Sequence, residues 1–134
     1  MDKLNLSEEE WKNRLSSEAY HVLREKGTEK PFTGAYYDCH DAGTYICAAF
    51  GQPLFSSEHK YDSGTGWPSF WMPISPDAIE LKEDRSLFMT RTEVLCSCCL
   101  SHLGHVFSDG PPPSYKRYCL NSVCLKLYSN NFKS

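Results

Sequence analysis

The most informative part of the sequence is LCSCCLSHLGHVF, residues 95–107, which holds three cysteines and two histidines within ten residues. Thiolate and imidazole are preferred zinc ligands, and the same two groups act as nucleophile and base in thiol enzymes. A third interpretation is a buried strand rich in thiols, because free cysteine is among the most buried residue types. The rest of the chain decides among a metal site, an active site and a structural strand.

Length and composition indicate one globular domain. The chain has 134 residues, of which 40% are hydrophobic and 13% aromatic, enough to bury a core without disulfides or a metal. The formal net charge of −3 gives no electrostatic reason for binding nucleic acid or an anionic membrane. We therefore expect neither as a partner.

The N-terminal stretch MDKLNLSEEEWKNRL is polar and acidic, without the apolar segment of a secretory signal, and no other stretch approaches a membrane span. We expect a cytoplasmic, reducing location and a monomer. The odd number of cysteines favours free thiols, metal ligands or a catalytic thiol over a disulfide framework. The seven cysteines are Cys39, Cys47, Cys96, Cys98, Cys99, Cys119 and Cys124.

Two short helices are predicted at the N-terminus. Ser7 and Glu10 have the spacing of a capping box, which starts the first helix. A second helical stretch, about 17–25, is predicted to stop at Gly27. We assign residues 1–29 to an N-terminal helical segment.

The remaining residues, 30–134, have the character of a β-domain. Aromatic and β-branched residues occur there in short runs broken by Gly, Pro, Asp and Ser. The clearest strand candidates are LFMTRTEVL (87–95) and RYCLNSVCLKLY (117–128). The predicted fold class is mainly β, with antiparallel sheets behind the short helices.

The strand predicted at 117–128 gives the first functional indication. Side chains alternate between the faces of a strand, so Cys119 and Asn121 would share one face, about 7 Å apart, with Cys124 on the other. The nearby Arg117 and the Asn121 amide favour a reactive thiolate at Cys119. The alternative is a small buried cysteine with no chemical role.

Five segments together resemble the methionine-R-sulfoxide reductase family, the MsrB type. The resemblance covers about residues 30–128 and implies a barrel-like β-tent domain for 30–134. The segments are SGTGWPSF (63–70), EVLCSCCLSHLGHVFSDGP (93–111), RYCLNS (117–122), KPFTGAYYD (30–38) and QPLFSSEHKYDSG (52–64).

The resemblance also implies a reaction. Cys119 matches the nucleophile, whose thiolate attacks the sulfur of R-configured methionine sulfoxide, releases methionine and becomes a sulfenic acid. Trp67 matches the residue that packs on the terminal methyl group of a free or protein-bound substrate. The remaining implied site residues are His102, His105, Asn121, Arg117 and Phe107. No cofactor is required for this chemistry.

An imidazole titrating near neutral pH suits proton delivery to the sulfoxide oxygen. We favour His105 over His102 as the closer participant. In an uninterrupted strand the two would face opposite sides, so a bulge at Gly104 is needed to bring them together. The alternative for His102 is a hydrogen-bonded structural histidine.

The chain departs from the family pattern at Thr65, where many members have a cysteine that resolves the sulfenic acid into a disulfide for thioredoxin. Threonine forms no disulfide. We expect direct attack on the sulfenic acid by an external thiol, thioredoxin or another, with Cys39 as the second candidate resolver. Cys124 is disfavoured, because it is predicted on the opposite face.

A second departure affects zinc. Many members bind structural zinc through two Cys-x-x-Cys pairs, and here Cys47, Cys96 and Cys99 remain while Phe50 occupies the fourth position. Structural zinc normally takes four closed ligands. The site is therefore dead, completed by an exogenous ligand, or completed by a spare residue. The spare residues are Cys39, His40 and Cys98.

Two other functions remain open: a non-catalytic zinc- or ligand-binding β-module, and an inactive scaffold. The set Trp67, His105, Cys119 and Asn121 argues against both, because a binding module has no need of it. A thiol–disulfide oxidoreductase is disfavoured, since the Cys96–Cys99 pair lacks a thioredoxin-like βαβ setting.

Overall fold

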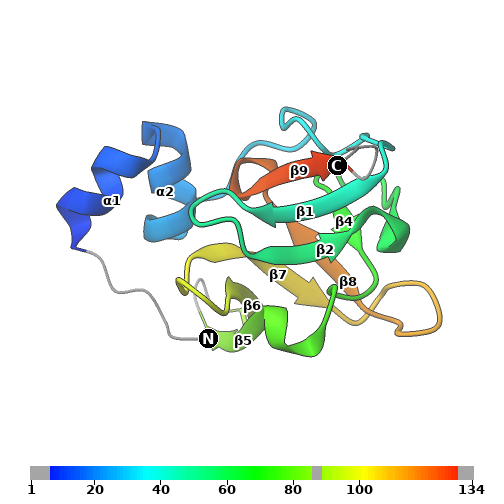
Figure 1. Ribbon diagram of the computed structural model, residues 1–134. Coiled ribbons are helices and arrows are strands. Elements are labelled where there is room, and N and C mark those ends of the chain that lie inside the picture. Colours follow the sequence, from blue (N-terminus) through cyan, green and yellow to red (C-terminus); the bar gives the residue numbers. More distant parts are fainter. Residues whose placement is uncertain (1–6, 86–88, 130–134) are drawn as a thin grey trace.

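The computed structural model describes residues 7–85 and 89–129 (Figure 1). Within these ranges no helix is both long enough and apolar enough to span a membrane. The expected N-terminal segment begins outside them, as does the start of the strand predicted at 87–95.

The first helix, α1 (Glu8–Arg14), begins as its sequence predicts. The Ser7 hydroxyl accepts a hydrogen bond from the Glu10 backbone N–H at 3.2 Å, and the Ser7 backbone N–H donates to the Glu10 carboxylate at 3.1 Å. This reciprocal pair satisfies backbone donors that a helix start otherwise leaves free. The predicted capping box is confirmed.

The second helix, α2 (Ser17–Glu25), has the predicted extent but ends differently. The left-handed residue that terminates it is Lys26, with φ 59°, and not the glycine after it. Gly27 instead lets the backbone pass close to the His21 ring, since a Cβ at this position would collide with that ring. In Figure 1 the two helices lie together at one end of the molecule.

The strands form two antiparallel sheets. The smaller has the order β2 (Pro53–Ser56), β1 (Gly43–Cys47), β9 (Leu125–Ser129). The larger has the order β3 (Lys60–Tyr61), β4 (Ser69–Phe70), β8 (Arg117–Leu120), β7 (His102–Phe107), β6 (Arg91–Cys96), β5 (Ile79–Asp84). Three 3₁₀ turns connect them: η1 (Ser57–His59), η2 (Pro76–Ala78) and η3 (Ser122–Cys124).

The single strand predicted at 117–128 is wrong. The segment divides into β8, the turn η3 and β9, and the two strands belong to different sheets. The break has an electrostatic cause, because the buried Glu29 carboxylate accepts the backbone N–H groups of Ser122 and Val123 at 2.9 and 3.0 Å. The strand alternation used to place Cys124 opposite Cys119 therefore does not apply.

Aromatic side chains join the two sheets into one core. Phe55 of β2 stacks on Phe70 of β4 with ring centroids 4.6 Å apart, and Tyr45 of β1 meets Phe70 edge-on at 5.2 Å. Such pairs add specific geometry to the burial of apolar area. The predicted class, mainly β with antiparallel sheets in a barrel-like arrangement, is confirmed, with two separate sheets across the described residues.

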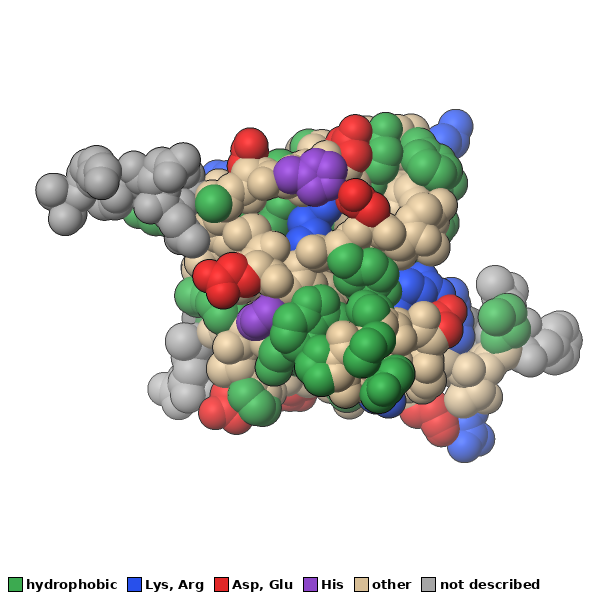
Figure 2. Space-filling model, turned by 90° about the vertical axis from the view of Figure 1, so that its right-hand side faces the viewer, with side chains coloured by type: hydrophobic (Ala, Val, Ile, Leu, Met, Phe, Trp, Pro, Cys, Tyr) green, Lys and Arg blue, Asp and Glu red, His purple; other side chains and the backbone are tan. Residues whose placement is uncertain are grey.

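Hydrophobic side chains are not confined to the core. Figure 2 shows a group of them on one face of the molecule, with histidine and charged side chains nearby. Among the described residues, large apolar side chains with substantial exposure include Met72, Ile74 and Tyr115. The protein thus presents an apolar surface as well as an apolar core.

Trp11 tests how α1 contributes to stability. Its ring is 2% exposed, lies under the Arg24 guanidinium at 4.2 Å and meets Phe50 edge-on at 5.4 Å. We expect Trp11→Ala to lower the free energy of unfolding by about 3–5 kcal/mol, measured by urea denaturation. The exposed Glu9→Ala on the same helix should change it by less than about 0.5 kcal/mol. Equal effects of the two would show that α1 does not stabilise the core.

Candidate active site

A cavity of about 270 Å³ lies over β7 and β8. It brings together six of the predicted site residues: Cys119, His105, Asn121, Arg117, Trp67 and Phe107. The rest of its lining is Thr28, Thr65, Arg91, Gly104 and Leu120. His102 and Cys39 are not among the lining residues.

The pairing of β7 with β8 places the thiol and the imidazole side by side. His105 lies directly opposite Cys119, and Phe107 lies opposite Arg117. Directly opposed residues project to the same face of an antiparallel pair, with Cβ atoms about 5 Å apart. Gly104 permits the close approach of these strands, since a Cβ there would collide with the carbonyl oxygen of Cys119.

The two histidines share a face because β7 contains a bulge. Val94 of β6 pairs with Gly104 and Leu95 pairs with His102, so Leu103 is an extra residue. The His102 and His105 ring centroids lie 5.4 Å apart. The expected bulge is present, with its extra residue immediately before the glycine.

Each histidine is held by a buried carboxylate that the sequence analysis missed. His105 Nε2 lies 2.9 Å from Asp84 Oδ2, and His102 Nδ1 lies 2.7 Å from Glu93 Oε2. His102 is 2% exposed, and burial lowers the pKa of its imidazole while the hydrogen bond to Glu93 opposes that shift. His102 thus lies behind the residues that line the pocket, and its ring is already hydrogen-bonded to Glu93.

Glu29 is a further residue that sequence reasoning did not identify. Its backbone carbonyl accepts a hydrogen bond from Trp67 Nε1 at 3.0 Å, and its backbone N–H donates to Asn121 Oδ1 at 3.0 Å. The Asn121 Nδ2 donates to the Leu103 carbonyl at 3.1 Å. Both ends of the Asn121 amide are therefore bound to backbone, and the Trp67 ring has a fixed orientation.

The pKa of the partly buried Cys119 thiol is set by opposing effects. Burial raises its pKa, while the charge of Arg117 and a hydrogen bond from the Thr65 hydroxyl lower it. Arg117 is itself fixed, since it donates to the Asp109 carboxylate at 2.9 and 3.2 Å and lies over the Phe107 ring at 4.4 Å. The expected cationic assistance is present, but burial outweighs it in the resting structure.

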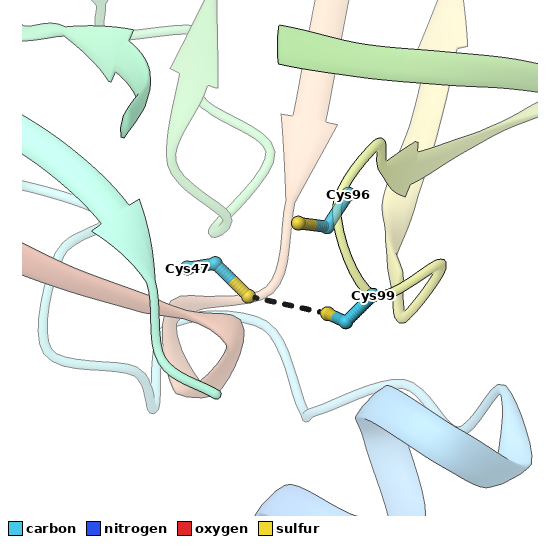
Figure 3. Close-up of side chains that lie close together, drawn as sticks. All are labelled: Cys47, Cys96 and Cys99. Atoms are coloured by element: carbon cyan, nitrogen blue, oxygen red, sulfur yellow. Dashed lines mark hydrogen bonds between the residues drawn. The ribbon is translucent and has the colours of Figure 1, made fainter. Parts of the chain in front are cut away.

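Three cysteines outside the pocket converge on one point. Cys47 ends β1, Cys96 ends β6 and Cys99 lies in the following turn (Figure 3). Their sulfur atoms lie within 4.8 Å of one another, with 3.8 Å between Cys47 and Cys99. The predicted partial ligand set is therefore assembled. Hydrogen bonds from the Cys47 and Cys96 thiols lower the pKa of Cys99.

The donor set is one ligand short of a closed tetrahedral zinc site. Among the described His, Cys, Asp and Glu residues, no fourth side chain joins the three thiols, so none of the spare residues completes the site. The Phe50 ring packs on Trp11 and under the Arg14 guanidinium at 4.2 Å, and it offers no lone pair. A closed four-ligand zinc site here needs a donor other than the described His, Cys, Asp and Glu side chains.

The fold and the pocket define a β-rich domain that sets a cysteine thiol beside an imidazole. A model of the SelR domain matches residues 15–129, and the chain belongs to this family. The resemblance to the methionine-R-sulfoxide reductases is confirmed by relatives named peptide methionine sulfoxide reductase MsrB.

Three such relatives come from different organisms. The Hahella chejuensis protein is 56% identical over 96% of this chain and 93% of its own length. The Methanosarcina barkeri protein is 62% identical over 96% of this chain and 87% of its own. The Leptospira interrogans protein is 55% identical over 93% of this chain and 95% of its own. The similarity thus extends over nearly the whole domain.

The electrostatic balance at Cys119 predicts a pH effect. Replacing Arg117 with methionine removes the charge that lowers the thiol pKa, so we expect the midpoint for Cys119 alkylation by iodoacetamide to rise by about one pH unit. Alkylation is followed at the Cys119 peptide by mass spectrometry. Lys116→Met, a neighbouring exposed change of the same charge, should leave the midpoint in place. An unchanged midpoint in Arg117→Met would contradict the proposed charge effect.

The cysteine cluster predicts a gain of metal binding. Phe50→Cys supplies a fourth thiolate, so we expect this variant to retain zinc through dialysis against a chelator that strips the unaltered chain. Metal content by mass spectrometry is the measurement. Phe50→Ala is the matched control, because it loses the same ring packing without adding a ligand. Equal zinc retention in the alanine and cysteine variants would rule out a ligand role for position 50.

Proposed function

We propose that the chain is a methionine sulfoxide reductase that acts on the R epimer, free or within oxidised proteins, with Cys119 as its nucleophile. The observation that carries this proposal is the pairing of Cys119 with His105 on one wall of a cavity that also contains Trp67. Its membership of the SelR family and the names of its relatives support the same reaction.

In the proposed step the Cys119 thiolate attacks the sulfoxide sulfur. This attack forms a bond between the two sulfur atoms, and the sulfoxide oxygen takes up a proton. The oxygen then moves to the Cys119 sulfur as its bond to the methionine sulfur and the sulfur–sulfur bond both break, which releases methionine and leaves a sulfenic acid on Cys119. Methionine sulfoxide is reduced by two electrons and the thiol is oxidised by two. His105 supplies the proton, because its ring lies beside the thiol and an imidazole titrates near neutral pH.

Selection of one epimer requires an apolar wall and a polar wall. Trp67 supplies an indole held by the Glu29 carbonyl, and Phe107 lines the same cavity with its ring under the Arg117 guanidinium. The methyl group of the substrate would face the indole, while its oxygen faces His105. In the opposite epimer these two groups exchange places, which leaves the oxygen against an apolar ring.

We further propose that an external thiol, thioredoxin or another, reduces the sulfenic acid directly. Cys119 is the only thiol among the residues that line the cavity. The side chain hydrogen-bonded to it is that of Thr65, which forms no disulfide. Cys124 is fully buried and donates to the His102 carbonyl at 3.3 Å, so it is not available for attack. Cys39 lies outside the lining and is the second candidate.

The test uses peptides carrying either the R or the S epimer, with dithiothreitol as reductant. We expect the R peptide alone to be reduced, Cys119→Ser to be inactive, and Cys39→Ser to retain activity. Peptide mass reports the product. Activity that survives in Cys119→Ser would overturn the proposed chemistry and favour a binding module.

A single turnover without reductant tests the regeneration step. We expect dimedone to label Cys119, because no other cysteine is among the residues that line the cavity. A mapped disulfide between Cys119 and Cys39 would instead identify an internal resolver.

A further inference from the structure

Lys26 bridges the two buried carboxylates behind the pocket. Its Nζ lies 3.7 Å from Asp84 Oδ1 and 3.5 Å from Glu93 Oε1. Each carboxylate uses its other oxygen to hold a histidine: Asp84 holds His105 at 2.9 Å and Glu93 holds His102 at 2.7 Å. One ammonium group from the end of α2 is thus connected to both histidines.

The backbone at Lys26 is unusual for a residue with a side chain. Its φ of 59° lies in the left-handed region, which costs a non-glycine residue about 1 kcal/mol or more. A glycine follows immediately, at Gly27, but the lysine takes the left-handed position. The conformation closes the C-terminal cap of α2, where the Gly27 N–H donates to the His21 carbonyl at 3.0 Å, and from this cap the Lys26 side chain reaches both carboxylates.

Charged side chains of both signs surround His105 among the described residues. The titratable and charged groups facing it are Asp84, Glu93, Arg91, His102, Arg117 and Cys119. Arg117 is neutralised by Asp109, while Arg91 lies 3.4 Å from Asp84. Two carboxylates, Asp84 and Glu93, thus face two cations, Arg91 and Lys26. Removing Lys26 takes one cation away from the buried carboxylates, and the more negative potential there favours a positive charge on the imidazoles that they hold.

We propose that Lys26 is a positioning residue for the reaction at Cys119: through Asp84 and Glu93 its ammonium fixes the ring orientation of His105 and weakens its hold on a proton. With Nε2 directed at Asp84, the other ring nitrogen is free for the cavity. A proton held less tightly is transferred more readily to the sulfoxide oxygen. The catalytic consequence of this inference rests on the proposed function, whereas the effect of Lys26 on the orientation and protonation of the His105 ring does not.

The primary experiment is a ring titration by nuclear magnetic resonance without substrate, with His105→Gln used to assign the signal. In Lys26→Met we expect the midpoint for His105 to rise by about half a pH unit, since one cation has been removed from the far side of its carboxylate. Lys26→Arg should restore the midpoint. Lys126→Met, an exposed lysine on β9 in the other sheet, is the matched control and should not move it.

The kinetic experiment follows the R-sulfoxide reaction across pH. Because the donor must be protonated, the alkaline limb of kcat should move up by the same half unit in Lys26→Met, with KM unchanged, since Lys26 does not line the cavity.

A folded Lys26→Met with the wild-type midpoint and pH profile would overturn the proposal. Thermal unfolding checks the fold, and Lys26→Gln replaces the methionine variant if that one does not fold. An inactive wild-type chain would refute the proposed function instead, and the ring titration would still decide the role of Lys26.

Discussion

The buried carboxylate of Glu29 is the contact on which the rest of the structure depends. It accepts two backbone N–H groups at the start of η3, the turn that takes the chain from one sheet to the other. The backbone of the same residue holds the Trp67 indole and the Asn121 amide. A charged acceptor is well suited to this position, because hydrogen bonds to an ionised group are about twice as strong as neutral ones. The fold and the pocket therefore share one anchor.

This anchor explains why the nucleophile lies at a strand end. Cys119 is the penultimate residue of β8, and the chain leaves the larger sheet two residues later. The sheet fixes the backbone of Cys119 between Ser69 and His105, while the turn beyond it opens the space that a substrate needs. Rigid backbone and an adjacent cavity are the usual requirements for a preorganised site.

The sequence predicts local features well and long-range ones poorly. Capping at Ser7 depends on three neighbouring residues, so it can be read directly, and the motif around Cys119 is equally local. Strand periodicity failed at 117–128 because the break comes from Glu29, some ninety residues away along the chain. Asp84 escaped notice for the same reason, since its pairing with His105 depends on how β5 joins the sheet.

The two halves of residues 95–107 perform separate tasks on either side of one turn. The cysteine half directs Cys96 and Cys99 toward Cys47, away from the cavity, while the histidine half forms the wall facing Cys119. Phe50, which occupies the fourth position of the zinc-ligand pattern, packs its ring against Trp11 of α1. A cysteine at this position would instead have offered a thiolate to a metal held by Cys47, Cys96 and Cys99. The turn between β6 and β7 is itself held by Arg24, which donates to the Cys99 carbonyl at 3.0 Å and to the Ser101 hydroxyl at 3.2 Å and lies over the Trp11 ring. Changes in the metal site can therefore occur without altering the residues of the pocket.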